Sequence, residues 1–149
     1  MKKKIKSTPH IEKYFIDKYF KPNLPFGFHS ELHKFANSSM DISDGLLIDL
    51  KNLVGKKKLS FILNCNLVPK SIFFKRLLKF KDKIKNKYLF DGDDYQILFT
   101  AKNEYRDRIF KSSKKWNQKV TRIGCIQIGS SNYMQFNNKL KKIHKEFYL

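Results

Sequence analysis

Apolar residues follow two alternating spacings along the chain, and this alternation limits the folds that it can adopt. Spacings of three and four residues, typical of a helix with one buried face, predict helices over residues 11–20, 46–54 and 70–85. Compact apolar runs predict strands over residues 59–65, 95–101, 120–128 and 133–136, with a Gly-Ser-Ser-Asn turn joining the last two. Helices and strands that alternate without a linker predict one layered α/β domain.

Two polar residues mark further expected helix starts. Ser30 is expected to cap a helix over residues 31–36, and Asn103 is expected to cap one that runs to about residue 114. A short extended piece over residues 39–42 lies between them. In the helix over 46–54 we expect the leucines to face the core and Asp49 to lie on the opposite face.

The composition is that of an ordinary globular protein. The chain has 149 residues, of which 41% are hydrophobic and 30% charged, so it can bury one core and is not expected to be disordered. After the basic start MKKKIK there is no apolar stretch that could serve as a signal peptide, and no run is long enough to cross a bilayer. We therefore expect a cytoplasmic protein with no membrane partner.

The net charge of +19 comes almost entirely from lysine. Of the 32 basic residues only four are arginine: Arg76, Arg106, Arg108 and Arg122. Proteins that recognise nucleic acid rely on arginine for bidentate contacts to bases and phosphates. We interpret the excess as a general preference for lysine at surface positions, which can still attract nucleotides, and a nucleic-acid partner is not expected.

The cysteines and two of the histidines show no metal-binding pattern. Cys65 and Cys125 stand far apart without a neighbouring ligand, so both are expected to be buried, reduced thiols. His29 and His33 lie four residues apart and could share a metal on one helix face. Without a third ligand nearby they are interpreted as the edge of a surface helix.

Five of the 13 acidic residues fall in two short turns: Asp41 and Asp44 in the first, and Asp91, Asp93 and Asp94 in the second. Each turn contains a glycine and lies between apolar stretches. Carboxylates packed this closely repel one another unless a cation offsets them. Mg²⁺ suits such sites because it binds one or two carboxylates together with phosphate oxygens and water.

The first turn also stands at the expected N-terminus of a helix. There Ser43 and Asp44 precede the N–H groups of Gly45 and Leu46, and a helix N-terminus attracts phosphate through unpaired amides and the helix dipole. The turn is therefore a candidate site for Mg²⁺ and phosphate. The alternative is that Ser43 or Asp44 only caps the helix and that Asp41 is solvated.

The second turn allows two other interpretations, both weaker. An EF-hand calcium loop that begins at Asp91 would need Gly at its sixth position and Glu at its twelfth, where this chain has Gln96 and Lys102. Residues 91–93 also fit the acid-x-acid pattern of metal-dependent sugar transferases, but three residues carry little specificity.

Two longer segments resemble signatures of thiamine-monophosphate kinases. Residues 38–50, SSMDISDGLLIDL, resemble the motif that opens the C-terminal domain of this family. Residues 91–100, DGDDYQILFT, resemble its second signature, usually GGEDYELLFT. VTRIG at residues 120–124 and YFKP at residues 19–22 resemble further segments in the same order, so the resemblance spans nearly the whole chain.

The resemblance implies a three-layer α/β/α domain of the aminoimidazole ribonucleotide synthetase type, with a mixed sheet flanked by helices. It implies transfer of the γ-phosphoryl group of ATP to thiamine monophosphate, giving thiamine diphosphate. The site residues that it implies are Asp41 and Asp44 for Mg²⁺, Ser43 and Gly45 for ATP, and Asp93 and His144 for the substrate, with Asp91 and Asp94 in support. Because the acceptor is already a phosphate oxyanion, no general base is required and no catalytic residue is assigned.

The chain departs from the family pattern in its second signature and near its C-terminus. Asp91 replaces a glycine, Asp93 is one methylene shorter than the usual Glu, and Gln96 replaces a Glu. In IHKEF at residues 143–147, His144 stands where the family has an aromatic residue that packs on the substrate. These changes concern substrate recognition more than metal binding.

The resemblance also divides the chain into two parts. Residues 1–21 are expected to form a basic tail and first helix, and residues 22–149 the C-terminal kinase domain. The N-terminal domain, which supplies most Mg²⁺-binding aspartates in the family, is expected to be absent, so activity should need a complementary N-terminal domain as partner. The alternatives are a non-catalytic remnant, or a basic module that binds nucleic acid or acidic surfaces through residues 70–87, with Phe73, Phe74 and Phe80.

Overall fold

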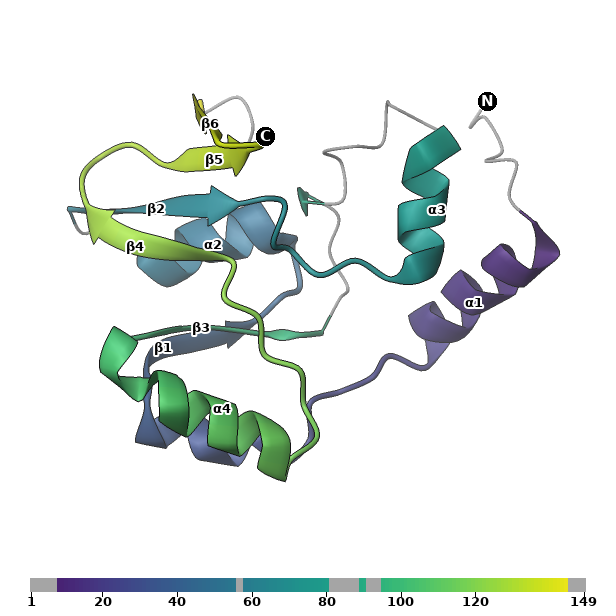
Figure 1. Cartoon of the computed structure of the whole chain (residues 1–149), viewed down its shortest axis with the longest axis horizontal. Helices are drawn as coiled ribbons and strands as arrows, with labels where there is room; N and C mark the ends of the chain where they lie inside the picture. The colour runs from purple at the N-terminus through teal and green to yellow at the C-terminus, as the bar shows by residue number, and fades with distance from the viewer. Residues whose placement is uncertain (1–7, 56–57, 81–88, 91–94, 145–149) are drawn as a thin grey trace.

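The strands of the protein form two sheets (Figure 1), and the computed structural model describes residues 8–55, 58–80, 89–90 and 95–144. The larger sheet has the order β4-β2-β5-β6. Its strands are β2 (Leu59–Asn64), β4 (Gly124–Ile128), β5 (Tyr133–Phe136) and β6 (Lys139–Lys142). The smaller sheet pairs β1 (Ala36–Asp41) antiparallel with β3 (Ile97–Ala101).

The larger sheet is mixed, as the resemblance implies. Strand β2 runs parallel to β5 and antiparallel to β4, so it separates the two strands that the Gly-Ser-Ser-Asn segment joins. Strand β6 was not predicted. It forms a hairpin with β5 through Asn137 and Asn138, whose φ angles of 45° and 64° are those of a two-residue hairpin turn. All four residues of β6, three of them lysines, are exposed at the end of the sheet.

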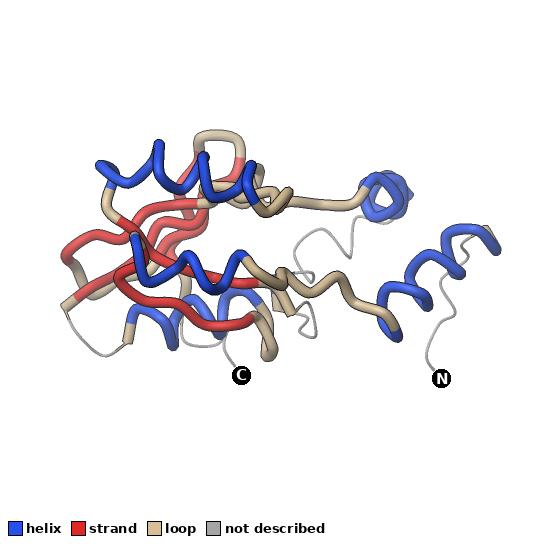
Figure 2. The backbone as a smooth tube through the Cα atoms, turned by 90° about the horizontal axis from the view of Figure 1, so that it is seen from below, coloured by secondary structure: helices blue, strands red, loops and turns tan. Residues whose placement is uncertain are grey.

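Helices lie on both sides of the strands (Figure 2), which gives the three layers expected from the resemblance. Helices α2 (Leu46–Val54) and α4 (Arg106–Lys115) lie over the strands (Figure 2), with the 3₁₀ segments η1 (Phe28–Lys34) and η4 (Asn103–Tyr105). Helices α1 (Pro9–Phe20) and α3 (Ile72–Phe80) lie beside the sheets (Figure 1) and contact each other through Tyr14 and Phe73. No helix of the described residues has the length and apolar character that crossing a bilayer requires.

Two predicted helix caps are wrong. Ser30 lies inside η1, and its hydroxyl donates to the carbonyl of Gly27 at 2.6 Å instead of capping a helix at residue 31. Asn103 opens the 3₁₀ segment η4, and its side chain makes no capping hydrogen bond to α4, which begins at Arg106. The helical spacings themselves are confirmed for α1, α2 and the described part of α3.

Helix α2 is the centre of the core. Its Leu47 is fully buried beside Phe61 and Leu63 of β2, and the same cluster includes Leu98 of β3 and Met134 of β5. One helix therefore packs against strands of both sheets. This position fixes the segment just before α2, which contains the first acidic turn.

A buried acid joins η1 to α4 elsewhere in the molecule. Glu31 is 5% exposed, and its carboxylate accepts hydrogen bonds from the ammonium groups of Lys34 at 2.7 Å and Lys115 at 2.8 Å, and from the Trp116 indole at 3.3 Å. The Lys115 hydrogen bond, followed by that of Lys34, lowers the pKa of Glu31 to about 2. The negative charge of Glu31 is therefore offset by lysines of the same chain and is not available to a ligand.

Candidate functional site

The first acidic turn begins from a firmly held point of the backbone. Strand β1 ends at Asp41, opposite Ile97 of β3. The next residue, Ile42, is buried and donates its N–H to the carbonyl of Gln96 at 2.9 Å, while its own carbonyl accepts the N–H of Tyr95 at 3.1 Å. The turn therefore leaves the smaller sheet with its start fixed by two hydrogen bonds and by the core.

Asp49 holds the rest of the turn from inside the protein. It is 1% exposed, and its Oδ2 accepts the backbone N–H groups of Ser43, Asp44 and Gly45 at 2.9, 3.0 and 3.2 Å. The prediction that Asp49 lies on the outer face of α2 is therefore wrong. The helical period placed it opposite the leucines, but the preceding turn folds back over that side and covers it. Its position one turn after Ser-Asp-Gly was the available sequence signal, since acids are favoured near helix N-termini.

Gly45 is required by the backbone at this position. Its φ angle is +116°, which residues with a side chain rarely adopt. A Cβ atom added there would lie 2.6 Å from the carbonyl oxygen of Phe90. The glycine thus allows the turn and the chain at Phe90 to approach closely.

The two candidate metal ligands of this turn, Asp41 and Asp44, are exposed, as is Ser43. Within the part of the chain that the structure describes, no ion pair joins either aspartate to a lysine or arginine. No group of three or more His, Cys, Asp or Glu side chains that could hold a metal is found there either. Any cation at this turn would therefore take its remaining ligands from phosphate, water or residues outside the described ones.

Neither sequence interpretation of the helix start is fully correct. Gly45 occupies the position before the first residue of α2, and no side chain caps the helix there, so capping by Ser43 or Asp44 is not observed. The amide of Gly45, expected to be available for phosphate, is instead donated to Asp49. The turn offers outward carboxylates and a hydroxyl, while its amides at residues 43–45 point inward.

The second acidic turn, with Asp91, Asp93 and Asp94, lies outside the described residues. The described residues on either side of it both contact the first turn. Phe90 approaches Gly45, and Tyr95 pairs with Ile42. The chain therefore enters and leaves the second turn beside the first one.

His144, the remaining predicted substrate residue, is exposed and follows β6. The preceding Ile143 is buried and donates its N–H to the carbonyl of Asn132 at 2.9 Å, which fixes the backbone there. No contact between His144 and the first turn is found among the described residues. Its role stays a prediction.

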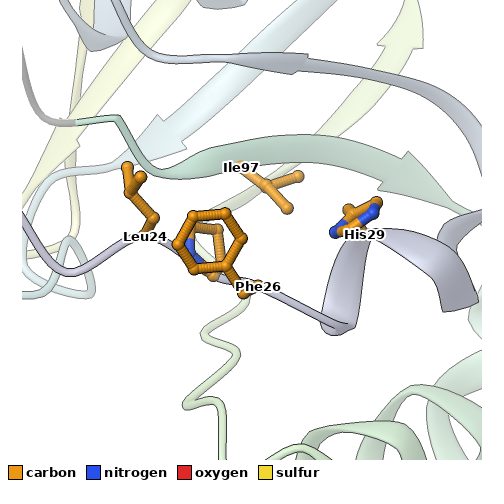
Figure 3. A pocket seen from close by; sticks show the side chains of 5 residues that line it. Leu24, Phe26, His29 and Ile97 are labelled. Carbon is orange, nitrogen blue, oxygen red and sulfur yellow. The ribbon is translucent and has the colours of Figure 1, made fainter.

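His29 and His33 lie in η1, and His29 lines a shallow apolar pocket with Leu24, Phe26 and Ile97 (Figure 3). A 3₁₀ helix has three residues per turn, so residues four apart do not share one face. The pocket is lined almost entirely by carbon. This arrangement favours the interpretation of these histidines as surface residues without a metal.

The cysteine prediction is half correct. Cys65 is buried, and burial raises the pKa of its thiol to about 11. Cys125 is exposed because it pairs with Ile62 and so lies on the face of the larger sheet opposite to the buried Phe61 and Leu63. Both are free cysteines.

The Phe73 ring of α3 packs against other rings of this chain, which disfavours a role for it in base stacking. The Phe73 ring packs against Tyr14 of α1, with ring centres 4.4 Å apart, and against His10 at 5.2 Å. Lys70, which precedes α3, donates to the carbonyls of Cys65 and Val68 at 2.9 and 3.2 Å. The Phe80 side chain and residues 81–87 lie outside the described part, so the rest of this alternative is untested.

Curated relatives support the family that the two motifs suggest, although no family model matches the chain. The thiamine-monophosphate kinase of Buchnera aphidicola subsp. Schizaphis graminum is 30% identical over 145 residues, which are 97% of this chain and 45% of that protein. The thiamine-monophosphate kinase of Aquifex aeolicus is 29% identical over 135 residues, covering 89% of this chain and 41% of that protein. The chain thus spans less than half the length of these relatives.

Solved structures agree with the curated relatives. The crystal structure of thiamine-monophosphate kinase from Stenotrophomonas maltophilia K279a matches with a TM-score of 0.76 and 26% identity, over 86% of this chain and 40% of that chain. The complex of AaThiL with AMPPCP and TMP matches with a TM-score of 0.70 and 26% identity, over 93% and 43%. In sequence and in fold, this chain is similar to the C-terminal part of thiamine-monophosphate kinases. The expected fold of the aminoimidazole ribonucleotide synthetase type is thereby confirmed.

Proposed function

We propose that this chain forms the C-terminal half of a Mg²⁺-dependent kinase that transfers the γ-phosphoryl group of ATP to thiamine monophosphate. The observation that carries the proposal is the turn at residues 41–45. Its two carboxylates are exposed on a backbone held by Ile42 and Asp49, beside the residues that flank the second acidic turn. The similarity to thiamine-monophosphate kinases, one of them bound to AMPPCP and TMP, supports the choice of substrates.

Asp41 and Asp44 are the residues of this chain that would hold Mg²⁺. Both present hard oxygen ligands to solvent and have no basic partner among the described residues. Two carboxylates with phosphate oxygens and waters form an ordinary Mg²⁺ site, so the residues present fit the ion. When bound, Mg²⁺ supplies neutralisation of the negative charge on the phosphates.

ATP binding is assigned to Ser43 and Gly45 in different ways. The exposed hydroxyl of Ser43 is able to donate to a phosphate oxygen. Gly45 contributes space, since its amide is donated to Asp49 and its lack of a side chain permits the approach of Phe90. We assign the substrate to Asp93 and His144, with Asp91 and Asp94 in support, from the family resemblance.

This chain need not move a proton from the acceptor. A phosphate monoester has its second pKa near about 6, so the attacking oxygen of thiamine monophosphate is already an anion near neutral pH. The task of the site is then to hold the donor and acceptor in line and to offset their charge. Fixed carboxylates that recruit a cation perform the second part of this task.

We further propose that the chain acts in the cytoplasm with a complementary N-terminal kinase domain. The relatives are more than twice as long as the matched region, and the resemblance assigns most Mg²⁺-binding aspartates to the part that this chain does not match. The chain should therefore show little turnover by itself and regain it with such a domain.

The test is to mix the chain with the N-terminal domain of a thiamine-monophosphate kinase and to measure ADP release with ATP, Mg²⁺ and thiamine monophosphate. Restored turnover that disappears with Asp44→Asn but not with Asp107→Asn, an exposed aspartate on α4, supports the proposal. Robust turnover by the isolated chain contradicts the need for a partner. No turnover by any mixture, with both components folded, contradicts the kinase assignment.

A further inference from the structure

Asp49 combines deep burial with contacts to three successive amides. Its Oδ2 accepts the N–H groups of Ser43, Asp44 and Gly45 within 2.9 to 3.2 Å. Its Oδ1 is also buried and has no hydrogen-bond partner among the described residues. A buried carboxylate held in this way has no basic side chain to offset it, because all the donors described for it are backbone groups.

Three successive amides that converge on one point form a concave anion site, of the kind that binds phosphate in many proteins. In this chain that site is already filled by an internal carboxylate. Since the amides of residues 43–45 point inward, the side chains of Ser43 and Asp44 remain exposed on the outer side of the turn. The carboxylate of Asp49 therefore lies on the inner side of this short turn, and the carboxylates of Asp41 and Asp44 lie on its outer side.

We infer that Asp49 is a positioning residue that occupies the anion site of the turn, fixes the backbone of residues 43–45, and thereby presents Asp44 to a cation beside Asp41, which β1 holds. This inference rests on the proposed function for the identity of the cation. It also implies that phosphate oxygens do not reach the amides of residues 43–45. Polyphosphate then contacts this turn only through the cation and the hydroxyl of Ser43.

The charge of Asp49, rather than its shape, is what the inference requires. Hydrogen bonds to an ionised acceptor are roughly twice as strong as those between neutral groups. Asp49→Asn keeps the size of the side chain and one oxygen acceptor but removes the charge. The matched control is Asn52→Ala, an exposed position on the same helix.

The experiment follows amide hydrogen exchange in the full chain by NMR. In Asp49→Asn, exchange at residues 43–45 is expected to accelerate about tenfold or more, while amides of β2 stay within about twofold of the wild type. Asn52→Ala is expected to leave both regions unchanged. Equal exchange at residues 43–45 in wild type and Asp49→Asn overturns the inference.

A second measurement separates this inference from the proposed function. Mn²⁺ added as a paramagnetic substitute for Mg²⁺ should broaden the signals of Asp41 and Asp44 in the wild type, and Asp49→Asn should need several-fold more Mn²⁺. If the wild type shows no broadening, the assignment of Asp41 and Asp44 as metal ligands fails. The exchange result still decides whether Asp49 fixes the backbone of residues 43–45. If broadening is equal in both proteins, Asp49 fixes the turn without positioning the ligands and the inference fails.

A variant that does not fold still leaves the inference open to test. Scalar couplings across the hydrogen bonds between the amide nitrogens of residues 43 and 44 and the carboxylate carbon of Asp49 are measurable in the wild-type chain. Their detection supports the hydrogen bonds by which Asp49 fixes the turn. Their absence, in a sample whose backbone couplings across β2 and β4 are visible, overturns it.

Discussion

Two buried carboxylates in this protein are held by different partners and serve different regions. Glu31 accepts hydrogen bonds from the side chains of Lys34, Lys115 and Trp116 and connects η1 to α4. Asp49 accepts three backbone amides and fixes the turn before α2. Around Glu31 the negative charge is offset within the fold by two ammonium groups. Around Asp49 it is not, because a backbone amide carries no net charge.

The difference shows how a short segment can keep its carboxylates available. If a lysine held the turn at residues 41–45, that ammonium group would also pair with Asp41 or Asp44 and compete with a metal ion. Backbone amides stabilise the buried carboxylate of Asp49 without introducing a cation. The region of Glu31 is therefore suited to stability, and the region of Asp49 is suited to ligand binding.

Removing the charge of Asp44 and removing the charge of Glu31 should have different consequences. In the mixture with an N-terminal kinase domain, Asp44→Asn should lower kcat about 100-fold or more, because a ligand of the cation that offsets the phosphate charge is lost. Glu31→Gln should leave kcat nearly unchanged and lower the melting temperature. ADP release and thermal melts of both variants measure the two effects. A loss of turnover in Glu31→Gln at temperatures where it stays folded would show that the regions are coupled.

The glycines at the two ends of α2 differ in how closely other backbone atoms approach them. Gly45 and Gly55 both have positive φ angles, but a Cβ at Gly45 would clash with the Phe90 carbonyl, whereas no atom of the described residues lies within 4 Å of one at Gly55. Gly55→Ala should cost about 1 kcal/mol of unfolding free energy, from strain alone. Gly45→Ala should cost about 2 kcal/mol or more, because backbone must also move. Urea unfolding measures both, and equal costs would show that the approach of Phe90 is not tight.

The pH dependence of stability tests the Glu31 region. The pKa of Glu31 in the folded protein, about 2, lies below its ordinary value of 4.5. Its contribution is therefore complete above about pH 4.5 and is lost as the pH falls from there toward 2. The difference in melting temperature between wild type and Glu31→Gln should be constant from pH 7 to 5 and shrink below pH 4.5. A difference that persists unchanged at pH 3 contradicts the ionic role of Glu31.

Salt should have the smallest effect, and it should act on one region only. The side chains of Lys34 and Lys115 are 43% and 61% exposed, so their pairs with Glu31 are open to screening. Raising the salt concentration from 0.1 to 1 M should reduce the melting-temperature cost of Lys115→Ala slightly. It should leave amide exchange at residues 43–45 unchanged, because Asp49 is buried. If the exchange rate at residues 43–45 also changed with salt, the regions of Glu31 and Asp49 would not differ in their exposure to screening.

The parts of the fold that depend on local spacing could be predicted from the sequence. The helices α1 and α2 and the strands β2, β3 and β5 lie where the spacing placed them, to within a few residues. The pairing of strands could not be predicted in this way, because β4 and β5 are neighbours in sequence but flank β2 in the sheet. Strand β6 carries three lysines in four residues, so its apolar signal is weak, although the preceding Asn-Asn pair is a hairpin signal.

The residues that could bind a ligand at the site were predictable from the sequence, but the residue that holds their backbone in place was not. Asp41, Asp44 and Ser43 stand out by residue type and glycine context, and the structure leaves them exposed together on one turn. Asp49 was placed on the wrong face because helical periodicity considers one element at a time. Its burial depends on the turn folding back over α2, which is a tertiary contact. The exposure of Cys125 likewise depends on strand pairing, which places it with Ile62 on the face opposite to the buried Phe61 and Leu63.

The lysines of β6 make the two margins of the larger sheet behave differently toward other molecules. A strand from a second copy that approached β6 would meet the ammonium groups of Lys139, Lys141 and Lys142, which disfavour such pairing. At the opposite margin, β4 presents Ile128, whose side chain is 87% exposed. Among the described strands, addition of a strand to this sheet is therefore expected at β4 rather than at β6.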